Sequence, residues 1–241
     1  MDELDELGRG IDFDHTENVS ADTLYYVGLL FYKGPGVGPN YAEAAKWFGK
    51  VAGLQYRTSY YYGDNLSPKL NVRISSAQYY LGLMYWYGRG VKQDYAEAVK
   101  WFTKAAECVR HKEAEYFLGG AYYTGQGVQQ DYAEAVKWYR KSAEKGNAEA
   151  QNIMGDACRD GKGVKQDCKE AVSWYQKAAE QGNAAAQNTL GDMYAGGLGV
   201  GKNLGEAMKW YMNAAQQGNA DARSNLEKVI GTLPKENLVH R

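Results

Sequence analysis

The sequence predicts an all-α solenoid of five helix-turn-helix repeats with a C-terminal capping helix. Three features recur in one register along the 241 residues: a tryptophan, a glycine and a Gly-x-Gly-Val segment. The tryptophans are Trp47, Trp101, Trp138, Trp174 and Trp210, and the repeat glycines are Gly28, Gly82, Gly119, Gly155 and Gly191. Successive members of both sets lie 54, 37, 36 and 36 residues apart. A fixed period of this length is typical of stacked repeats.

Each repeat reads as two helices. Residues 76–88 carry small and apolar side chains at helical spacing, which predicts a buried face. This first helix should end at Gly88, because glycine adopts the positive φ that a helix stop needs, and Asp94 should cap the second helix. An alanine one turn before each later tryptophan should let the helices approach closely: Ala98, Ala135, Ala171 and Ala207. One hairpin cannot bury its apolar face alone, so the hairpins should stack into a superhelical rod.

The repeats divide the chain into segments. The solenoid should span 21–232, and residues 1–20 should form an acidic cap or tail. Within the solenoid we expect repeats at about 21–52, 75–108, 112–146, 148–182 and 184–218, an insertion at 53–74 and a capping helix at 220–231, followed by a tail at 233–241. Residues 1–20 carry a net charge of −6 and the remainder +5. A lid over the first repeat and a frayed tail are both compatible with this charge.

The insertion adds 18 residues between the first two repeats. It is rich in tyrosine, and Gly63-Asp64-Asn65 suggests the turn of a short β-hairpin within 58–74. One interpretation is a tolerated surface loop, since loops absorb length at little cost. The other is a binding loop, since long loops in compact scaffolds are often functional and exposed tyrosines are good contact residues.

Cys158 and Cys168 replace two framework aromatic residues of the same repeat. We therefore expect the two cysteines to face each other across the hairpin, with Cα atoms within about 10 Å. A disulfide is conceivable at such positions, but free thiols are favoured because nothing indicates an oxidising compartment. Cys108 has no partner in the sequence.

The repeat pattern resembles the Sel-one-like repeat (SLR) family, a relative of the tetratricopeptide repeat. The third repeat matches it almost throughout, at Leu118-Gly119, Tyr122, Gly125 to Val128, Asp131-Tyr132, Ala135, Trp138-Tyr139 and Ala143. The resemblance covers residues 21 to about 232. It implies a right-handed α/α superhelix that binds other proteins and has no catalytic residues common to the family.

In tetratricopeptide-like solenoids the first helix of each hairpin lines the concave face. Positions three before the repeat glycine, and one, four and five after it, should then be exposed. These positions are mainly aromatic in repeats one to three and polar in repeats four and five. The predicted partner-binding residues are Tyr25, Leu29, Tyr32, Tyr79, Leu83, Trp86, Tyr87, Tyr116 and Tyr123, with further loop contacts from Tyr56, Tyr60, Tyr61 and Tyr62. Exposed aromatic patches are costly without a use, and Tyr and Trp are enriched in binding hot spots. Alternatively, these aromatics pack on one another or on the N-terminal segment.

We expect no catalytic residues, metal or cofactor. The histidines, His15, His111 and His240, lie too far apart in sequence to suggest a zinc set or a triad. The Gly-rich segment at 196–203 nearly spells a phosphate-binding loop but follows a helix rather than a strand. Ser142 and Lys145 match S-x-x-K, yet the companion motifs of penicillin-recognising enzymes are absent.

The leading prediction is a non-catalytic scaffold or adaptor that binds a peptide or partner protein on its concave face. The alternative is an immunity or inhibitor protein that blocks one toxin or enzyme. A net charge of −1 argues against nucleic-acid binding, and the short apolar runs argue against membrane insertion. We expect a cytoplasmic monomer, or a periplasmic or secreted protein if a signal peptide was removed.

Overall fold

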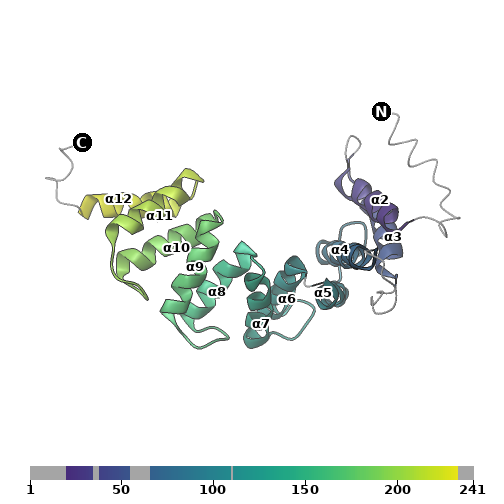
Figure 1. Cartoon of the computed structure of the whole chain (residues 1–241), viewed down its shortest axis with the longest axis horizontal. Coiled ribbons are helices and arrows are strands. Elements are labelled where there is room, and N and C mark those ends of the chain that lie inside the picture. The colour runs from purple at the N-terminus through teal and green to yellow at the C-terminus, as the bar shows by residue number, and fades with distance from the viewer. Residues whose placement is uncertain (1–19, 35–37, 55–65, 110, 233–241) are drawn as a thin grey trace. The chain divides into compact units, whose positions relative to one another are not determined.

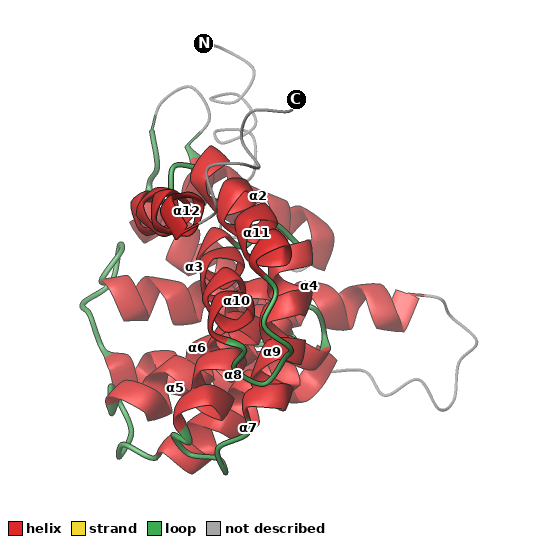
Figure 2. Cartoon of the chain, turned by 90° about the vertical axis from the view of Figure 1, so that its left-hand side faces the viewer, coloured by secondary structure: helices red, strands yellow, loops and turns green. Residues whose placement is uncertain are grey.

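The computed structural model describes residues 20–34, 38–54, 66–109 and 111–232. Over these residues it contains eleven α-helices and no strand (Figures 1 and 2). The helices are α2 (Ala21–Lys33), α3 (Tyr41–Ala52), α4 (Leu66–Tyr87), α5 (Tyr95–Val109), α6 (Lys112–Thr124), α7 (Tyr132–Glu144), α8 (Ala148–Asp160), α9 (Cys168–Glu180), α10 (Ala184–Gly196), α11 (Leu204–Gln216) and α12 (Ala220–Thr232). The predicted all-α fold of five helix pairs and a C-terminal helix is confirmed. The handedness of the superhelix stays a prediction.

The chain divides into two compact units, with the boundary inside α6. The first unit comprises residues 1–117 and 125–129, and the second comprises 118–124 and 130–241. In the first unit α4 packs against α2, α3 and α5. In the second unit α7 to α12 pack in succession, each helix against the next.

The ends of the helices follow the local signals in the sequence. The second helices begin at an Asn or Asp whose side chain accepts a hydrogen bond from a backbone amide of the first turn: Asn40, Asp94, Asp131, Asp167 and Asn203. The first helices of repeats four and five begin in the same way at Asn147 and Asn183. These caps satisfy amides that have no partner within the helix, which stabilises each helix start.

The two glycines of each turn meet different needs. Gly88 has a φ of +67° and lies just beyond the end of α4, as predicted. Gly90 has a φ of +71°, and a Cβ there would overlap the backbone of Tyr41 in the preceding repeat. Gly163 lies against Tyr132 in the same way. The second glycine is therefore required for contact between consecutive repeats.

The repeat glycines bring the two helices of each hairpin together. All five are buried, and a Cβ on each would overlap a ring of the second helix: Phe48, Phe102, Tyr139, Tyr175 and Tyr211. The four predicted alanines are fully buried, and Trp47, Trp174 and Trp210 are buried as well. Trp101 and Trp138 are half-buried.

The start of α4 corrects the prediction of a β-hairpin within 58–74. Residues 66–74 are helical, and 58–65 lie outside the described residues. Pro68 stands in the first turn, where a helix tolerates proline because the missing amide would have no partner. Arg73 connects this N-terminal part of α4 to α2. Its Nε donates a hydrogen bond to the Asp22 carboxylate at 2.6 Å, and its Nη2 donates one to the Tyr26 hydroxyl at 2.7 Å.

Candidate functional site

The predicted partner-binding residues lie on the first helices α2, α4 and α6. Tyr87 and Tyr123 are exposed, at 51% and 38% of their surface. Five others are half-buried: Leu29, Tyr32, Tyr79, Trp86 and Tyr116. The tyrosines of the insertion, Tyr56, Tyr60, Tyr61 and Tyr62, lie outside the described residues.

The expected exposure of Tyr25 and Leu83 is wrong, because both are buried. The Tyr25 ring packs against Phe48, with centroids 6.0 Å apart, and burial raises its pKa. Leu83 follows Gly82, and the close approach of Gly82 to Phe102 turns this part of α4 toward α5.

Within the first unit, the aromatic side chains of the predicted face contact one another. The Tyr32 ring lies 5.3 Å from Tyr41 and 5.0 Å from Tyr80. Trp86 lies 4.9 Å from Tyr95 and 5.9 Å from Phe117. This mutual packing is what the alternative interpretation expects, so Trp86 and Tyr32 contribute to the fold whatever they bind.

In the first unit, arginine side chains lie over the rings of several tyrosines, two of which are exposed. The Arg89 guanidinium is 5.0 Å from the Tyr87 ring and 5.5 Å from the Tyr41 ring. Arg73 lies 4.8 Å from the ring of Tyr26, which is 50% exposed. Tyr26 was not predicted as a contact, because the position two before the repeat glycine is not among those expected to be exposed.

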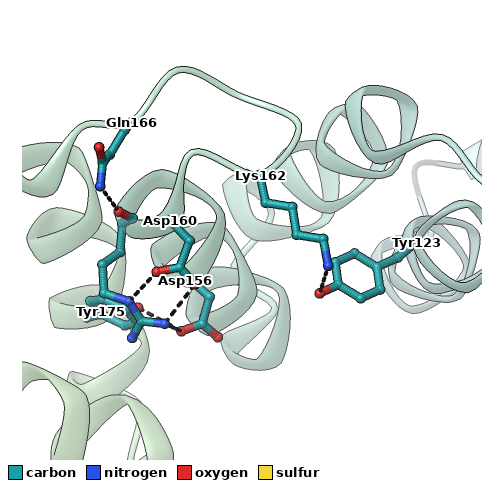
Figure 3. A network of polar contacts seen from close by, with 7 residues as sticks. Tyr123, Asp156, Asp160, Lys162, Gln166 and Tyr175 are labelled. Carbon is teal, nitrogen blue, oxygen red and sulfur yellow. Dashed lines mark hydrogen bonds and ion pairs between the residues drawn. The ribbon is translucent and has the colours of Figure 1, made fainter.

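In the second unit Tyr123 of α6 forms a polar and aromatic group with Lys162, which lies in the turn after α8 (Figure 3). Lys162 Nζ donates to the Tyr123 hydroxyl at 2.7 Å, which raises the pKa of this lysine. The same ammonium lies 4.2 Å from the ring centroids of Tyr123 and Tyr132. Gln130 Nε2 donates to the Tyr123 carbonyl at 2.8 Å, which holds the end of α6 in place.

Arg159 pairs with two carboxylates, Asp156 and Asp160, which are labelled in Figure 3. Its Nε and Nη2 donate to the two Asp160 oxygens at 2.7 and 3.0 Å, and this pairing lowers the pKa of Asp160. The same Nη2 lies 3.2 Å from Asp156. Asp156 also accepts a hydrogen bond from the Tyr175 hydroxyl at 2.7 Å, and burial together with this bond raises the pKa of Tyr175.

A pocket of about 210 Å³ lies between these two groups. Its lining consists of Tyr123, Val136, Tyr139, Ile153, Asp156, Ala157, Asp160 and Lys162. This volume is below the range of about 300–1,000 Å³ usual for small-molecule sites, so the pocket suits a single side chain. Three of its residues, Tyr123, Asp156 and Asp160, occupy predicted first-helix positions. The pocket itself was not predicted, because part of its lining, Val136 and Tyr139, comes from the second helix α7.

Cys158 and Cys168 are free thiols. Cys158 is buried and Cys168 half-buried. Burial raises the pKa of Cys158 to about 11, with the nearby charge of Glu170 adding to the shift. The Cys158 carbonyl accepts from the amide of Asp167 at 2.8 Å, next to Cys168. The predicted separation of their Cα atoms stays a prediction.

The described residues hold no group of three or more His, Cys, Asp or Glu side chains placed to bind a metal ion. None of the described helices combines the length and the hydrophobicity needed to cross a bilayer.

A family model of known proteins matches this chain in five segments, and these segments coincide with the helix pairs of the structure. The Sel1 repeat matches residues 21–56, 75–108, 112–147, 148–183 and 184–219. The chain belongs to the Sel1 repeat family. Proteins with Sel1 repeats generally mediate protein–protein interactions.

Two solved Sel1-type structures are similar over most of the chain. A protective antigen of uropathogenic Escherichia coli strains with an SLR fold is 35% identical, with a TM-score of 0.76. The match covers 92% of this chain but 43% of the E. coli chain. A Sel1 repeat protein from Oxalobacter formigenes is 33% identical, with a TM-score of 0.72, covering 91% of this chain and 82% of that one. A search of curated proteins finds no significant match.

Proposed function

We propose that this Sel1 repeat protein is a non-catalytic interaction scaffold that binds a peptide or partner protein through its first helices. The observation that carries the proposal is the exposure of Tyr87 and Tyr123 at the ends of α4 and α6. Each is accompanied by a cation, Arg89 or Lys162, that lies over its ring. Exposed tyrosine and arginine are typical of interaction hot spots.

The proposed contacts are the first-helix residues that keep accessible surface: Leu29, Tyr32, Tyr79, Trp86, Tyr87, Tyr116 and Tyr123. Tyr25 and Leu83 are left out because they are buried. The expected partner is a protein or peptide rather than nucleic acid, since the net charge is −1. We propose that the scaffold acts as a monomer in the cytoplasm.

Affinity purification with the full chain, followed by titration of each recovered partner, tests this proposal. If the tyrosine is a hot spot, Tyr87→Ala or Tyr123→Ala should weaken the binding free energy of a partner by about 2 kcal/mol, which is roughly a thirtyfold loss of affinity. Met212→Ala is the matched control, because Met212 is an exposed apolar residue (46%) on the second helix α11. It should leave binding unchanged.

Normal binding by both tyrosine variants would contradict the proposal. If Arg159→Ala or Asp192→Ala abolished binding instead, the site would lie in repeats four and five. Several weak partners would support an adaptor, whereas one tight stoichiometric partner would support an inhibitor or immunity protein.

A further inference from the structure

Where the first three repeats meet, an aromatic side chain of the later repeat covers a ring on the second helix of the earlier repeat. We call each place where consecutive repeats meet a junction and number it by the earlier repeat. At junction one, Tyr80 stacks on Phe48 with ring centroids 4.9 Å apart and planes 7° apart. At junction two, Phe117 stacks on Phe102 at 4.9 Å and 19°. Both covering residues stand two positions before a repeat glycine.

Junction three differs in the residue at this position. The corresponding side chain is Ile153, which has no ring, and the second-helix ring is Tyr139. The pocket of about 210 Å³ lies here, and both Ile153 and Tyr139 line it. The pocket thus lies where an aromatic side chain stands at the two preceding junctions.

We infer that junction three accepts an aromatic side chain of the partner, which enters beside Ile153 and contacts the part of Tyr139 that lines the pocket, although Tyr139 itself is only 5% exposed. The inference rests on the proposed function and names the anchor residue of the partner. Val136, Ile153 and Ala157 provide apolar contacts around the ring. Offset rings 4.5–7 Å apart attract each other beyond simple burial of apolar surface, and the chain itself uses this geometry at junctions one and two.

The charges around the pocket favour a neutral ring over a basic side chain. Asp156 and Asp160 carry two negative charges, and Arg159 and Lys162 carry two positive ones. Both carboxylates are paired with Arg159, and Lys162 is bonded to Tyr123. An arginine or lysine of the partner would have to compete with these pairs, whereas a neutral ring leaves them intact.

A titration of the full chain with N-acetyl-phenylalaninamide tests the pocket without knowledge of the partner. The readout is the methyl NMR spectrum of protein labelled at isoleucine and alanine. The chain has four isoleucines, so loss of one signal in Ile153→Val assigns Ile153. The probe should shift the Ile153 and Ala157 methyl signals by its ring current. N-acetyl-argininamide and N-acetyl-leucinamide at the same concentration should shift them several times less.

Two variants fill the pocket with side chains that the chain uses at the same register elsewhere. Ile153→Phe supplies the ring that Phe117 provides at junction two. Ala157→Met supplies the residue found at Met84 and Met193. Each variant should lower the affinity for the phenylalanine probe at least tenfold. Binding is followed at the Ala157 methyl signal in Ile153→Phe and at the Ile153 methyl signal in Ala157→Met. Ile153→Val should keep binding, and the second variant serves if the first does not fold.

The inference is overturned if the arginine probe shifts these signals as strongly as the phenylalanine probe does. It is also overturned if Ile153→Phe and Ala157→Met both still bind the phenylalanine probe as the wild type does. A partner recovered equally well by the wild type and the filled variants would overturn the inference and leave the proposed function standing. Conversely, a partner insensitive to Tyr87→Ala and Tyr123→Ala but lost in Ile153→Phe would support the pocket and contradict the proposed tyrosine contacts.

Discussion

Two adjacent glycines in α6 show how strongly the effect of a residue depends on its neighbours. A Cβ at Gly119 would lie 2.6 Å from Tyr139 Cδ1, closer than side chains tolerate. A Cβ at Gly120 would first meet the Tyr139 hydroxyl oxygen at 3.5 Å, an ordinary contact. Glycine lowers helix stability relative to alanine, so only the first position gains from glycine.

We predict that Gly119→Ala lowers the free energy of unfolding by about 1–3 kcal/mol, as overpacking against a buried ring does. Gly120→Ala should be neutral or stabilise by up to about 1 kcal/mol, since it only raises helix propensity. Urea unfolding of both variants measures the difference. Equal effects would show that Tyr139 moves aside without cost.

At the scale of the element, Glu170 links two second helices. Glu170 lies in the first turn of α9. Its carboxylate accepts a hydrogen bond from Trp174 Nε1 of the same helix at 3.1 Å and another from Arg140 Nη1 of α7 at 2.9 Å. The bond from Trp174 and the pairing with Arg140 lower the pKa of Glu170. The Glu at this position in the third repeat, Glu134, pairs instead with Lys137 of its own helix.

We predict that Glu170→Gln lowers the free energy of unfolding at pH 7 by up to about 1 kcal/mol, the upper range for a partly exposed pair. The pKa of Glu170 is lower in the folded than in the unfolded chain, so the stabilisation is present above the unfolded value of about 4.3. It is lost as the pH falls through the folded value. Thermal unfolding from pH 7 to pH 3 measures this.

Glu134→Gln is the matched control, because Glu134 stands at the same position of the third repeat and pairs with Lys137 of its own helix. It should have a smaller effect at pH 7. A stability difference between Glu170→Gln and the wild type that persists undiminished at pH 3 would exclude the charged pairing as its cause.

For the whole molecule, stacking of similar repeats predicts unfolding that starts locally. In such proteins each repeat contacts mainly its neighbours, so stability is roughly a sum over repeats and junctions. In the second unit, α12 follows the last helix pair and packs on α11. Damage to the fifth repeat should therefore spread toward the fourth only in part.

We predict that Trp210→Ala costs about 3–5 kcal/mol, because the side chain is buried in α11. Hydrogen exchange should show loss of amide protection in α10, α11 and α12, with more protection kept in α8. Met212→Ala, an exposed position of the same helix, should change little. A uniform loss across the second unit would mean that its repeats unfold as one block.

The helices, their ends and their order were predictable from the sequence because the signals are local. Asp94, Gly88 and the alanines act within one or two turns of their own position. The same reasoning failed at the start of α4, because Gly63-Asp64-Asn65 suggests the turn of a hairpin that would include residues 69–74. In the structure Ile74, Ala77 and Leu81 instead continue one buried face of a helix.

Only the tertiary structure determined which aromatic side chains are available for contact. Tyr25 and Tyr87 both stand at first-helix positions that the repeat register predicts to be exposed, yet Tyr25 is buried and Tyr87 is exposed. The pocket at junction three likewise depends on the size of Ile153 and on the ring of Tyr139 from another helix. Burial and cavities are set by side chains from several helices at once, so a repeat pattern that fixes each helix separately does not determine them.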